Sequence, residues 1–595
     1  MREMIRNIFW ALVACSLLWN CTGKPSEPLT WAALGLAGSD PATEDSAGPG
    51  TFAPGETENP TPTASSDGLV ACLSENDALF VSFDSGSDSN AGLSSSAAVK
   101  TLSHALSLAT SGQTLCIQNR SGGAAYDETS ATLDVPSGVS LVGGFDSAWE
   151  HTSTPARIDG HRIALRYLNL NGDAELNSLD IRAADPSSAS QDSMGLRIVY
   201  GTAKLSIIDA RIVSGDINAT AIEGDPAGSS YGIYAFELAN LEIEDSEIES
   251  GRGGNGGDGA EGDEGADGDP GDPGGAIVDC TSNGSGAPGG AGGLHPTLVS
   301  LNGSKGGDGG QTSGGGSGGD DGDGDCAGSG SARADGPAKG GDATCNGDAG
   351  DAGDSAEDPV SGPGAMDDFF QPVSGIDGDD GEHGAPGSGG GGGGAHVCFW
   401  CDDTPGNGGG GGGAAGSSGE GGKAGSGGGG SFALYAKNTN VTLRNTSLTS
   451  RRGGNGGGGG NGGPGGSGGD GGIGLDPCPG RGGAGGNGGS GGDGGDGGDA
   501  SGGSGGPSIP LVLVNGSLSL DTAMLDAGDG GNGGSSRNGR SGDGGHSYAI
   551  FVSDPGLLPD TSGSTLSYGT AGLPGSISGT GPAGSSGTTA SQGNP

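Results

Sequence analysis

The residues whose types and spacing could carry chemistry are cysteines and clustered aspartates. Cys398-Phe-Trp-Cys401 is a CxxC pair with His396 beside it, a spacing found at redox and metal sites. No second CxxC pair and no βαβ pattern accompanies it, so we favour a structural disulfide. Asp321-Gly-Asp-Gly-Asp325 could bind Ca²⁺ through the carboxylates of Asp321, Asp323 and Asp325, but Cys326 stands where an EF-hand loop needs glycine. We expect a solvated acidic loop that binds calcium weakly at most, and no other cofactor.

Enzymatic chemistry would need acids grouped with a basic residue. Asp159, His161 and Arg162 come closest, near the edge of a predicted strand. No Ser-His-Asp set, phosphate-binding loop or pair of catalytic carboxylates stands out in the sequence. We therefore expect structural or surface roles for these three residues and name no catalytic residue.

The N-terminus carries an export signal. Arg2 and Arg6 precede the apolar stretch 8–19, which is too short to span a bilayer. Leu-Val-Ala-Cys15 and Leu-Trp-Asn-Cys21 resemble the lipidation motif of bacterial lipoproteins, and an ordinary secretory signal is the remaining alternative. Lipidation at Cys21 leaves an even number of cysteines, whereas lipidation at Cys15 leaves an odd number, so we predict Cys21. The remaining disulfide candidates are Cys72, Cys116, Cys280, Cys326, Cys345, Cys398, Cys401 and Cys478.

Composition limits the kind of fold that can position these residues. Of 595 residues 143 are glycine, and only 30% are hydrophobic, so one conventional core cannot run along the whole chain. The net charge of −49 excludes nucleic acid as a partner, because phosphate contacts need lysine and arginine.

Glycine recurs at every third position in long tracts. It occupies each third residue through 453–474 and again through 482–497, with the proline-rich break 475–481 between them. Period three fits polyproline-II geometry rather than a helix or a strand. A flexible linker needs no such phase, so we favour a bundle of polyglycine-II helices over a floppy or disordered coat. The Gly-X-Y stretch 259–274 is too short to favour a collagen triple helix.

A repeat connects the tracts to predicted strands. Its four copies share apolar residues at the third, fifth and tenth positions, and each follows a short apolar strand. The last three copies run directly into Gly-Gly-Asn-Gly-Gly, so we expect the tracts to leave one corner of successive turns and to lie side by side. The copies are 203–215, 239–251, 439–451 and 516–528.

The segment before these repeats resembles a known fold family. The stretch 86–92 (Gly-Ser-Asp-Ser-Asn-Ala-Gly), the helix after Lys100, and Gly143-Gly-Phe145 with Trp149 resemble the start of pectin-lyase-like right-handed β-helices of bacterial surface proteins. Cys72 and Cys116 flank this cap, and we expect them to pair. The resemblance does not fix function, because the fold hosts lyases, hydrolases, adhesins and passive scaffolds.

The sequence therefore predicts an all-β protein, a right-handed parallel β-helix with long polyglycine-II-like excursions between its rungs. We expect a non-enzymatic surface lipoprotein of the outer membrane or cell surface, anchored in the membrane by its lipid, that serves adhesion, display or matrix interaction through a glycan or protein ligand. The alternative is a polysaccharide-degrading lyase or hydrolase. The expected segments are a signal peptide at 1–20, a lipid-anchored flexible linker at 21–69, the cap and first rungs at 70–251, the first excursion at 252–430, a rung at 431–451, the second excursion at 452–507, the final rungs at 508–570 with a short excursion at 528–546, and a disordered tail at 571–595.

Overall fold

The computed structural model describes residues 67–280, 284–312, 317–332, 338–358, 362, 364–398, 402–478, 481–554, 556 and 558–593. These residues belong to one compact unit that begins at Ser65. The predicted signal peptide, the lipidation candidates Cys15 and Cys21, and Cys401 lie outside the described residues. Within the described part of the chain, no helix has the length and apolar character needed to cross a membrane.

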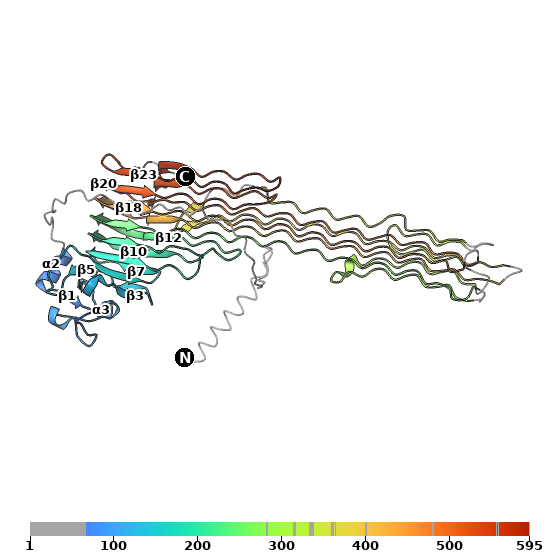
Figure 1. Cartoon of the computed structure of the whole chain (residues 1–595), viewed down its shortest axis with the longest axis horizontal. Coiled ribbons are helices and arrows are strands. Elements are labelled where there is room, and N and C mark those ends of the chain that lie inside the picture. Colours follow the sequence, from blue (N-terminus) through green and yellow to red (C-terminus); the bar gives the residue numbers. More distant parts are fainter. Residues whose placement is uncertain are drawn as a thin grey trace. The chain divides into compact units, whose positions relative to one another are not determined.

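The fold is mostly β-structure with large parallel sheets (Figure 1). The described residues include only two α-helices, α2 (Asp67–Ser74) and α3 (Leu102–Leu108). The larger sheet has 14 strands. Its main path is β1 (Ala78–Val81), β2 (Thr114–Gln118), β5 (Ser140–Phe145), β8 (Ala174–Asn177), β10 (Ser193–Ile208), β12 (Ser230–Glu244), β16 (Ser431–Lys437), β19 (Leu511–Val514), β22 (Ser547–Val552) and β24 (Thr589–Gly593), and β4 (Leu133–Val135), β7 (Ile163–Leu170), β17 (Asn440–Arg444) and β20 (Leu518–Asp521) pair beside it.

A second parallel sheet has eight shorter strands. They follow one another in the order β3 (Tyr126–Glu128), β6 (Ala156–Gly160), β9 (Leu179–Ala183), β11 (Arg211–Val213), β13 (Glu247–Glu249), β18 (Ser447–Ser450), β21 (Met524–Ala527) and β23 (Thr565–Ser567). Strands β14 (Ala365–Met366) and β15 (Phe370–Gln371) form a separate antiparallel hairpin.

The apolar positions of the repeat are stacked in register. Leu205, Leu241, Val441 and Leu518 pair in succession along the larger sheet, and the fifth positions of the repeat pair in the same way. The tenth positions are stacked along the second sheet, as Ile212, Ile248, Leu448 and Leu525. Most of these side chains are fully buried in one hydrophobic cluster, so each repeat contributes the same layer to a continuous core.

A sharp corner recurs between the two sheets. The seventh residue of every repeat has a positive φ of 45–54°, in the left-handed region that non-glycine residues rarely adopt. Short polar side chains tolerate it best, and the Asn445 amide donates to the Asp245 carboxylate at 2.6 Å across neighbouring corners. These corner residues are Asp209, Asp245, Asn445 and Thr522.

The first end of the stack is covered. Helix α2 packs on β1, β2 and β5, and α3 packs on β1 and β3. The disulfide Cys72–Cys116 joins α2 to β2, in agreement with the pairing that the sequence suggested.

The glycine tracts leave after β13, β18 and β21 and return to β16, β19 and β22, running side by side between these strands (Figure 1). The chain after 570 differs from the expected disordered tail. Residues 571–588 lie against the tract 530–545, and β24 pairs in register with β22, because this segment repeats the same tract-and-strand pattern once more.

Candidate functional site

The glycine tracts form a hydrogen-bonded bundle around the tract 406–430. Its residues donate in turn to different neighbours: Gly410 to the Gly486 carbonyl at 2.9 Å, Gly411 to that of Asp272 at 3.0 Å and Gly412 to that of Ser304 at 2.7 Å. The first two of these directions recur every three residues as far as Gly429, and the third continues to Ala415. Every backbone N–H from 406 to 430 has an acceptor, either a neighbouring carbonyl or a side-chain atom.

Other tracts donate into the same central tract. Gly390 donates to the Gly410 carbonyl at 2.9 Å, Gly472 to that of Gly411 at 2.7 Å and Gly293 to that of Gly412 at 2.8 Å. The central tract is therefore bonded to neighbours on all sides, and residues 404–417 are buried although they carry almost no apolar side chain.

The close approach of the tracts requires glycine. A Cβ on Gly410 would lie 1.9 Å from the Gly472 carbonyl oxygen, and one on Gly413 would lie 1.9 Å from that of Gly469. Real Cβ atoms essentially never come closer than 3.0 Å to such atoms. The tract glycines 453–474 have no φ in the left-handed region, so they are needed for space rather than for an unusual backbone conformation.

Aspartate and asparagine side chains satisfy the outward-facing amides of neighbouring tracts. Asp258 accepts from the N–H of Gly458 at 2.7 Å, and Asp493 accepts from that of Gly468 at 2.8 Å. The same contact is made by Asp267, Asp308, Asp342, Asp377, Asp380, Asp496, Asp499 and Asn487. Part of the acidity of the tracts thus has a structural role, because these carboxylates accept hydrogen bonds as the carbonyl of a neighbouring tract would.

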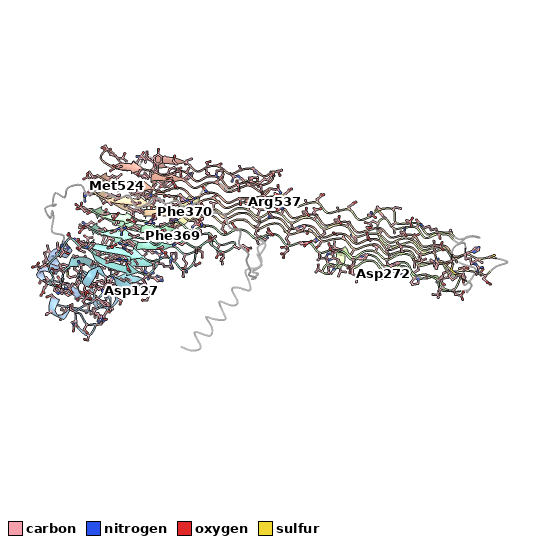
Figure 2. All side chains as sticks on the ribbon, viewed as in Figure 1. Asp127, Asp272, Phe369, Phe370, Met524 and Arg537 are labelled. Carbon is pink, nitrogen blue, oxygen red and sulfur yellow. A yellow bond between two sulfur atoms is a disulfide. The ribbon has the colours of Figure 1, made fainter. Side chains whose placement is uncertain are left out.

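These contacts change how the carboxylates titrate. The N–H of Asn487 and the ammonium of Lys339 lower the pKa of Asp342, and Lys305 with the N–H of Gly289 lowers that of Asp308. Figure 2 labels Asp272 on the bundle surface, and Arg537, which is paired with Asp499 at 2.6 Å.

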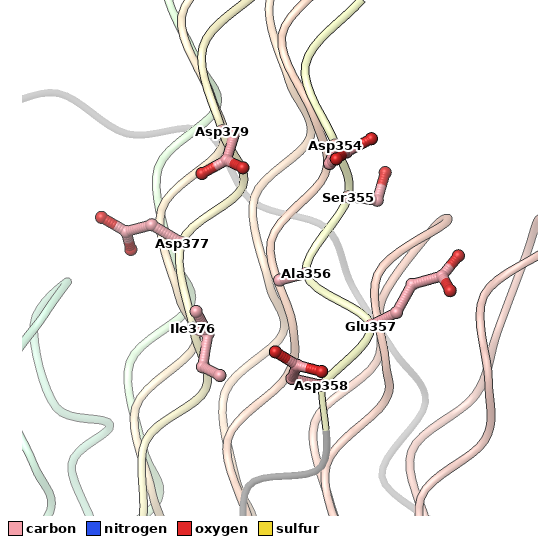
Figure 3. A pocket seen from close by; sticks show the side chains of 8 residues that line it. All are labelled: Asp354, Ser355, Ala356, Glu357, Asp358, Ile376, Asp377 and Asp379. Atoms are coloured by element: carbon pink, nitrogen blue, oxygen red, sulfur yellow. The ribbon is translucent and has the colours of Figure 1, made fainter.

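One hollow on the bundle gathers carboxylates. It has a volume of about 500 Å³ and is lined by Asp354, Glu357, Asp358, Asp377 and Asp379 (Figure 3). Lys423 lies 3.5 Å from Asp377 and offsets part of the charge. Across the described residues, no group of three His, Cys, Asp or Glu side chains is placed to hold a metal ion.

The calcium candidates Asp321, Asp323 and Asp325 are exposed on one tract. Asp321 accepts from the N–H of Gly330 at 2.6 Å, as the other tract carboxylates do. Calcium binding by these residues stays a prediction.

The other cysteines are found along the tracts. Disulfides join Cys280 to Cys478 and Cys326 to Cys345, and Cys398 is also disulfide-bonded. Covalent links within segments that have little apolar core fit an exported, extracellular chain.

An aromatic layer lies on the outer face of the larger sheet. Tyr231 and Tyr234 of β12 pack against Phe432 and Tyr435 of β16. A strap formed by residues 364–371 covers them, and Figure 2 labels its Phe369 and Phe370. The Phe369 ring stacks on Tyr234 at 4.3 Å, and the Tyr234 hydroxyl donates to the Asp368 carbonyl at 2.7 Å. The Phe-Phe pair inside a glycine-rich excursion was the sequence signal for this strap, and it was missed.

A shallow groove follows the corner of the sheet stack. It has a volume of about 350 Å³, and Asp209, Arg211, Asp245 and Glu247 line it. Burial raises the pKa of Asp209, although Ser178 and His151 oppose the shift. Burial and the Glu249 charge raise that of Glu247.

Within the described part of the chain, no hydrogen bond or ion pair joins Asp159, His161 and Arg162 to one another. Asp159 is paired with Arg157 at 2.9 Å, and Arg162 donates to the Asp192 carbonyl at 3.1 Å. The Nδ1 atom of His161 is buried and has no hydrogen-bond partner among the residues that the structure describes.

Comparisons with known proteins give only weak likenesses. No protein-family model matches the sequence, and no curated protein matches it. A solved rhamnogalacturonan lyase is 11% identical over 29% of this chain and 69% of its own, with a TM-score of 0.13. A GH136 lacto-N-biosidase from Eubacterium ramulus is 8% identical over 30% of this chain and 52% of its own, with a TM-score of 0.14. Likeness at this level supports no argument about this chain.

Proposed function

We propose that this protein is a non-enzymatic surface scaffold whose rigid polyglycine-II bundle serves display, adhesion or matrix contact. The observation that supports the proposal is the central tract 406–430, which has a hydrogen-bond acceptor for every backbone N–H. A bundle bonded in this way resists bending, because each tract is fixed to several others at every turn. The carboxylates on its outside keep such a surface hydrated and available for ligands.

The base of the bundle is, in this proposal, a right-handed parallel β-helix that ends each turn at the same corner. The in-register stacking of the repeat and the recurring left-handed corner residues support it. Because successive turns are about 4.8 Å apart, tracts that leave one corner meet at the spacing that their hydrogen bonds need.

The chain is anchored in the membrane by a lipid attached to Cys21, with Cys15 as the alternative. This anchor holds the protein at the outer membrane or cell surface. The disulfides fit such an exported location. The ligand we propose is an extracellular glycan or protein.

The proposal is tested by inserting an epitope tag at the exposed Asp476, near the far end of the second tract, and adding antibody-coated beads to intact and permeabilised cells. We expect intact cells to bind the beads as well as permeabilised cells do. Binding by permeabilised cells alone would contradict surface display.

A polysaccharide-acting enzyme is the second candidate, because the corner groove holds two acids, Asp209 and Glu247, whose pKa values are both raised. Incubation of the purified chain with polygalacturonate would release reducing ends or unsaturated products in that case. Loss of the release in Asp209→Asn or Glu247→Gln, at unchanged thermal stability, would replace the scaffold proposal by this one.

A further inference from the structure

At the far end of the sheet stack, the described residues place no helix or strand beyond β23 and β24, unlike at the first end. Strands β23 and β24 lie last in their sheets, and no described strand pairs with their outer sides. At the first end, helices α2 and α3 pack on β1 and β3, and β3 carries the acids Asp127 and Glu128. Unprotected strand edges pair readily with another chain, so natural proteins cover or charge them. Among the described residues, no strand pairs with the outer sides of β23 and β24, and neither strand contains a charged residue.

The segment that contains β23 and β24 has no charged side chains. The chain has a net charge of −49, but residues 561–595 contain no Asp, Glu, Lys, Arg or His. The negative charge of the chain lies before this segment, where like charges disfavour contact with a second copy. Leu573 is 63% exposed and Tyr568 is 48% exposed in this uncharged layer, so its outer surface is partly apolar as well.

The last tract also has free hydrogen-bonding groups. Within residues 571–588, the amides of Ala571, Gly581, Ala583 and Ser586 donate to no described residue. Some outward amides of earlier tracts, such as those of Gly458 and Gly465, donate to an aspartate side chain of a neighbouring tract. The four amides of the last tract are therefore available to a further hydrogen-bond acceptor.

We propose that this uncharged end layer, residues 561–593, is an interface at which a second copy of the chain docks end to end across a two-fold axis. A two-fold axis brings each strand edge against its own copy in the antiparallel direction. Antiparallel hydrogen bonding between tracts already occurs within the bundle, where Gly457 and Gly460 donate to the carbonyls of Ser426 and Lys423. Parallel hydrogen bonding also occurs, because Gly256 and Gly259 donate to a tract that runs in the same direction. The identical neutral faces make the contact self-complementary, and the cap at the first end stops it from continuing into a fibre.

The test is the molar mass of the exported chain by light scattering across a dilution series, with Cys15→Ser and Cys21→Ser so that lipid cannot cluster it. We expect twice the mass of one chain at about 0.1 mM, falling to one chain on dilution. Leu573→Asp and Ser586→Asp place a carboxylate in the neutral layer and should weaken dimerisation by at least about tenfold. Ile473→Asp is the matched control, because Ile473 is 56% exposed on a distant tract, and it should leave the dimer unchanged.

Three results would overturn the proposal: a single-chain mass at about 0.1 mM, a dimer that Leu573→Asp and Ser586→Asp leave intact, or open-ended polymers in place of a dimer. Thermal unfolding of each variant separates loss of the interface from loss of the fold, since both substituted side chains are exposed. This inference does not depend on the proposed surface function, because bead capture by cells reports display and not self-association.

Discussion

Replacing Gly460 with alanine should open the glycine bundle locally, whereas the same change at Gly458 should be harmless. The two positions are two residues apart on one tract. A Cβ on Gly460 would lie 1.7 Å from the Ala260 carbonyl oxygen, which is fixed backbone. A Cβ on Gly458 meets nothing closer than the Ser535 hydroxyl at 3.1 Å, and that side chain can rotate away.

The size of the effect follows from the hydrogen bonds at Gly460. To bring its Cβ out to 3.0 Å, the tract must move by about 1.3 Å. Gly460 donates to Lys423 at 2.8 Å and accepts from Ala500 at 2.9 Å, so a shift of this size breaks both bonds. Two lost hydrogen bonds and the buried groups left unsatisfied cost about 3–5 kcal/mol. Gly458→Ala should lie within about 1 kcal/mol of the unmodified chain, because alanine restricts the unfolded chain at no cost to the native backbone.

Amide hydrogen exchange read by mass spectrometry on peptides from 453–474 measures the difference. Gly460→Ala should raise the local exchange rate by more than about a hundredfold, while Gly458→Ala leaves it unchanged. Equal exchange in the two variants would refute the claim that backbone contact between tracts dictates glycine.

Three further outcomes are expected. The pKa of Asp342 lies below its ordinary 3.8, mainly because its carboxylate accepts a hydrogen bond from the N–H of Asn487. The stability that Asp342 contributes is therefore complete above pH 3.8 and is lost as the pH falls through the lowered pKa. Asp342→Asn should abolish the rise in amide exchange of the 482–497 tract that accompanies this loss. Reducing the disulfide Cys280–Cys478, whose cysteines are 198 residues apart, should lower the free energy of unfolding by up to about 5 kcal/mol, because the unfolded chain is no longer restricted by the closed loop. Amide exchange at the far end of the bundle should become faster, and an unchanged rate would contradict a stabilising role of this disulfide. Phe369→Ala should free the strap, seen as faster exchange in 364–371 with the sheet strands still protected; loss of protection throughout would show that the strap is part of the core.

The buried positions of the repeat and the glycine at every third residue of the tracts were the parts of the fold that could be predicted from the sequence. The third, fifth and tenth positions of the repeat lie buried and in register because a parallel stack aligns equal positions of equal turns. The third-residue glycine phase predicted tracts in contact, since only a neighbour at van der Waals distance requires it. The left-handed corner at the seventh position of the repeat could also have been predicted, because Asp209, Asp245 and Asn445 are residue types that tolerate a positive φ.

The candidate site was harder to predict, because its contacts join distant segments. The bond from Gly458 to Asp258 spans 200 residues, and no local pattern indicates that an aspartate in one tract serves an amide in another. Without that contact, the acidic residues suggested loose calcium binding or solvation only. Residues 571–593 suggested disorder by composition, although they complete the last tract and strand because a neighbouring tract supplies their hydrogen bonds.

The distance between two spin labels, attached to Arg452→Cys and Ser467→Cys with the native disulfides intact, tests the rigid bundle most directly. Both side chains are exposed and 15 residues apart on one tract. At the polyproline-II rise of about 3.1 Å per residue, the account predicts a narrow distribution near 47 Å. A flexible glycine chain of that length would give a broad distribution near about 21 Å, and that result would contradict the account.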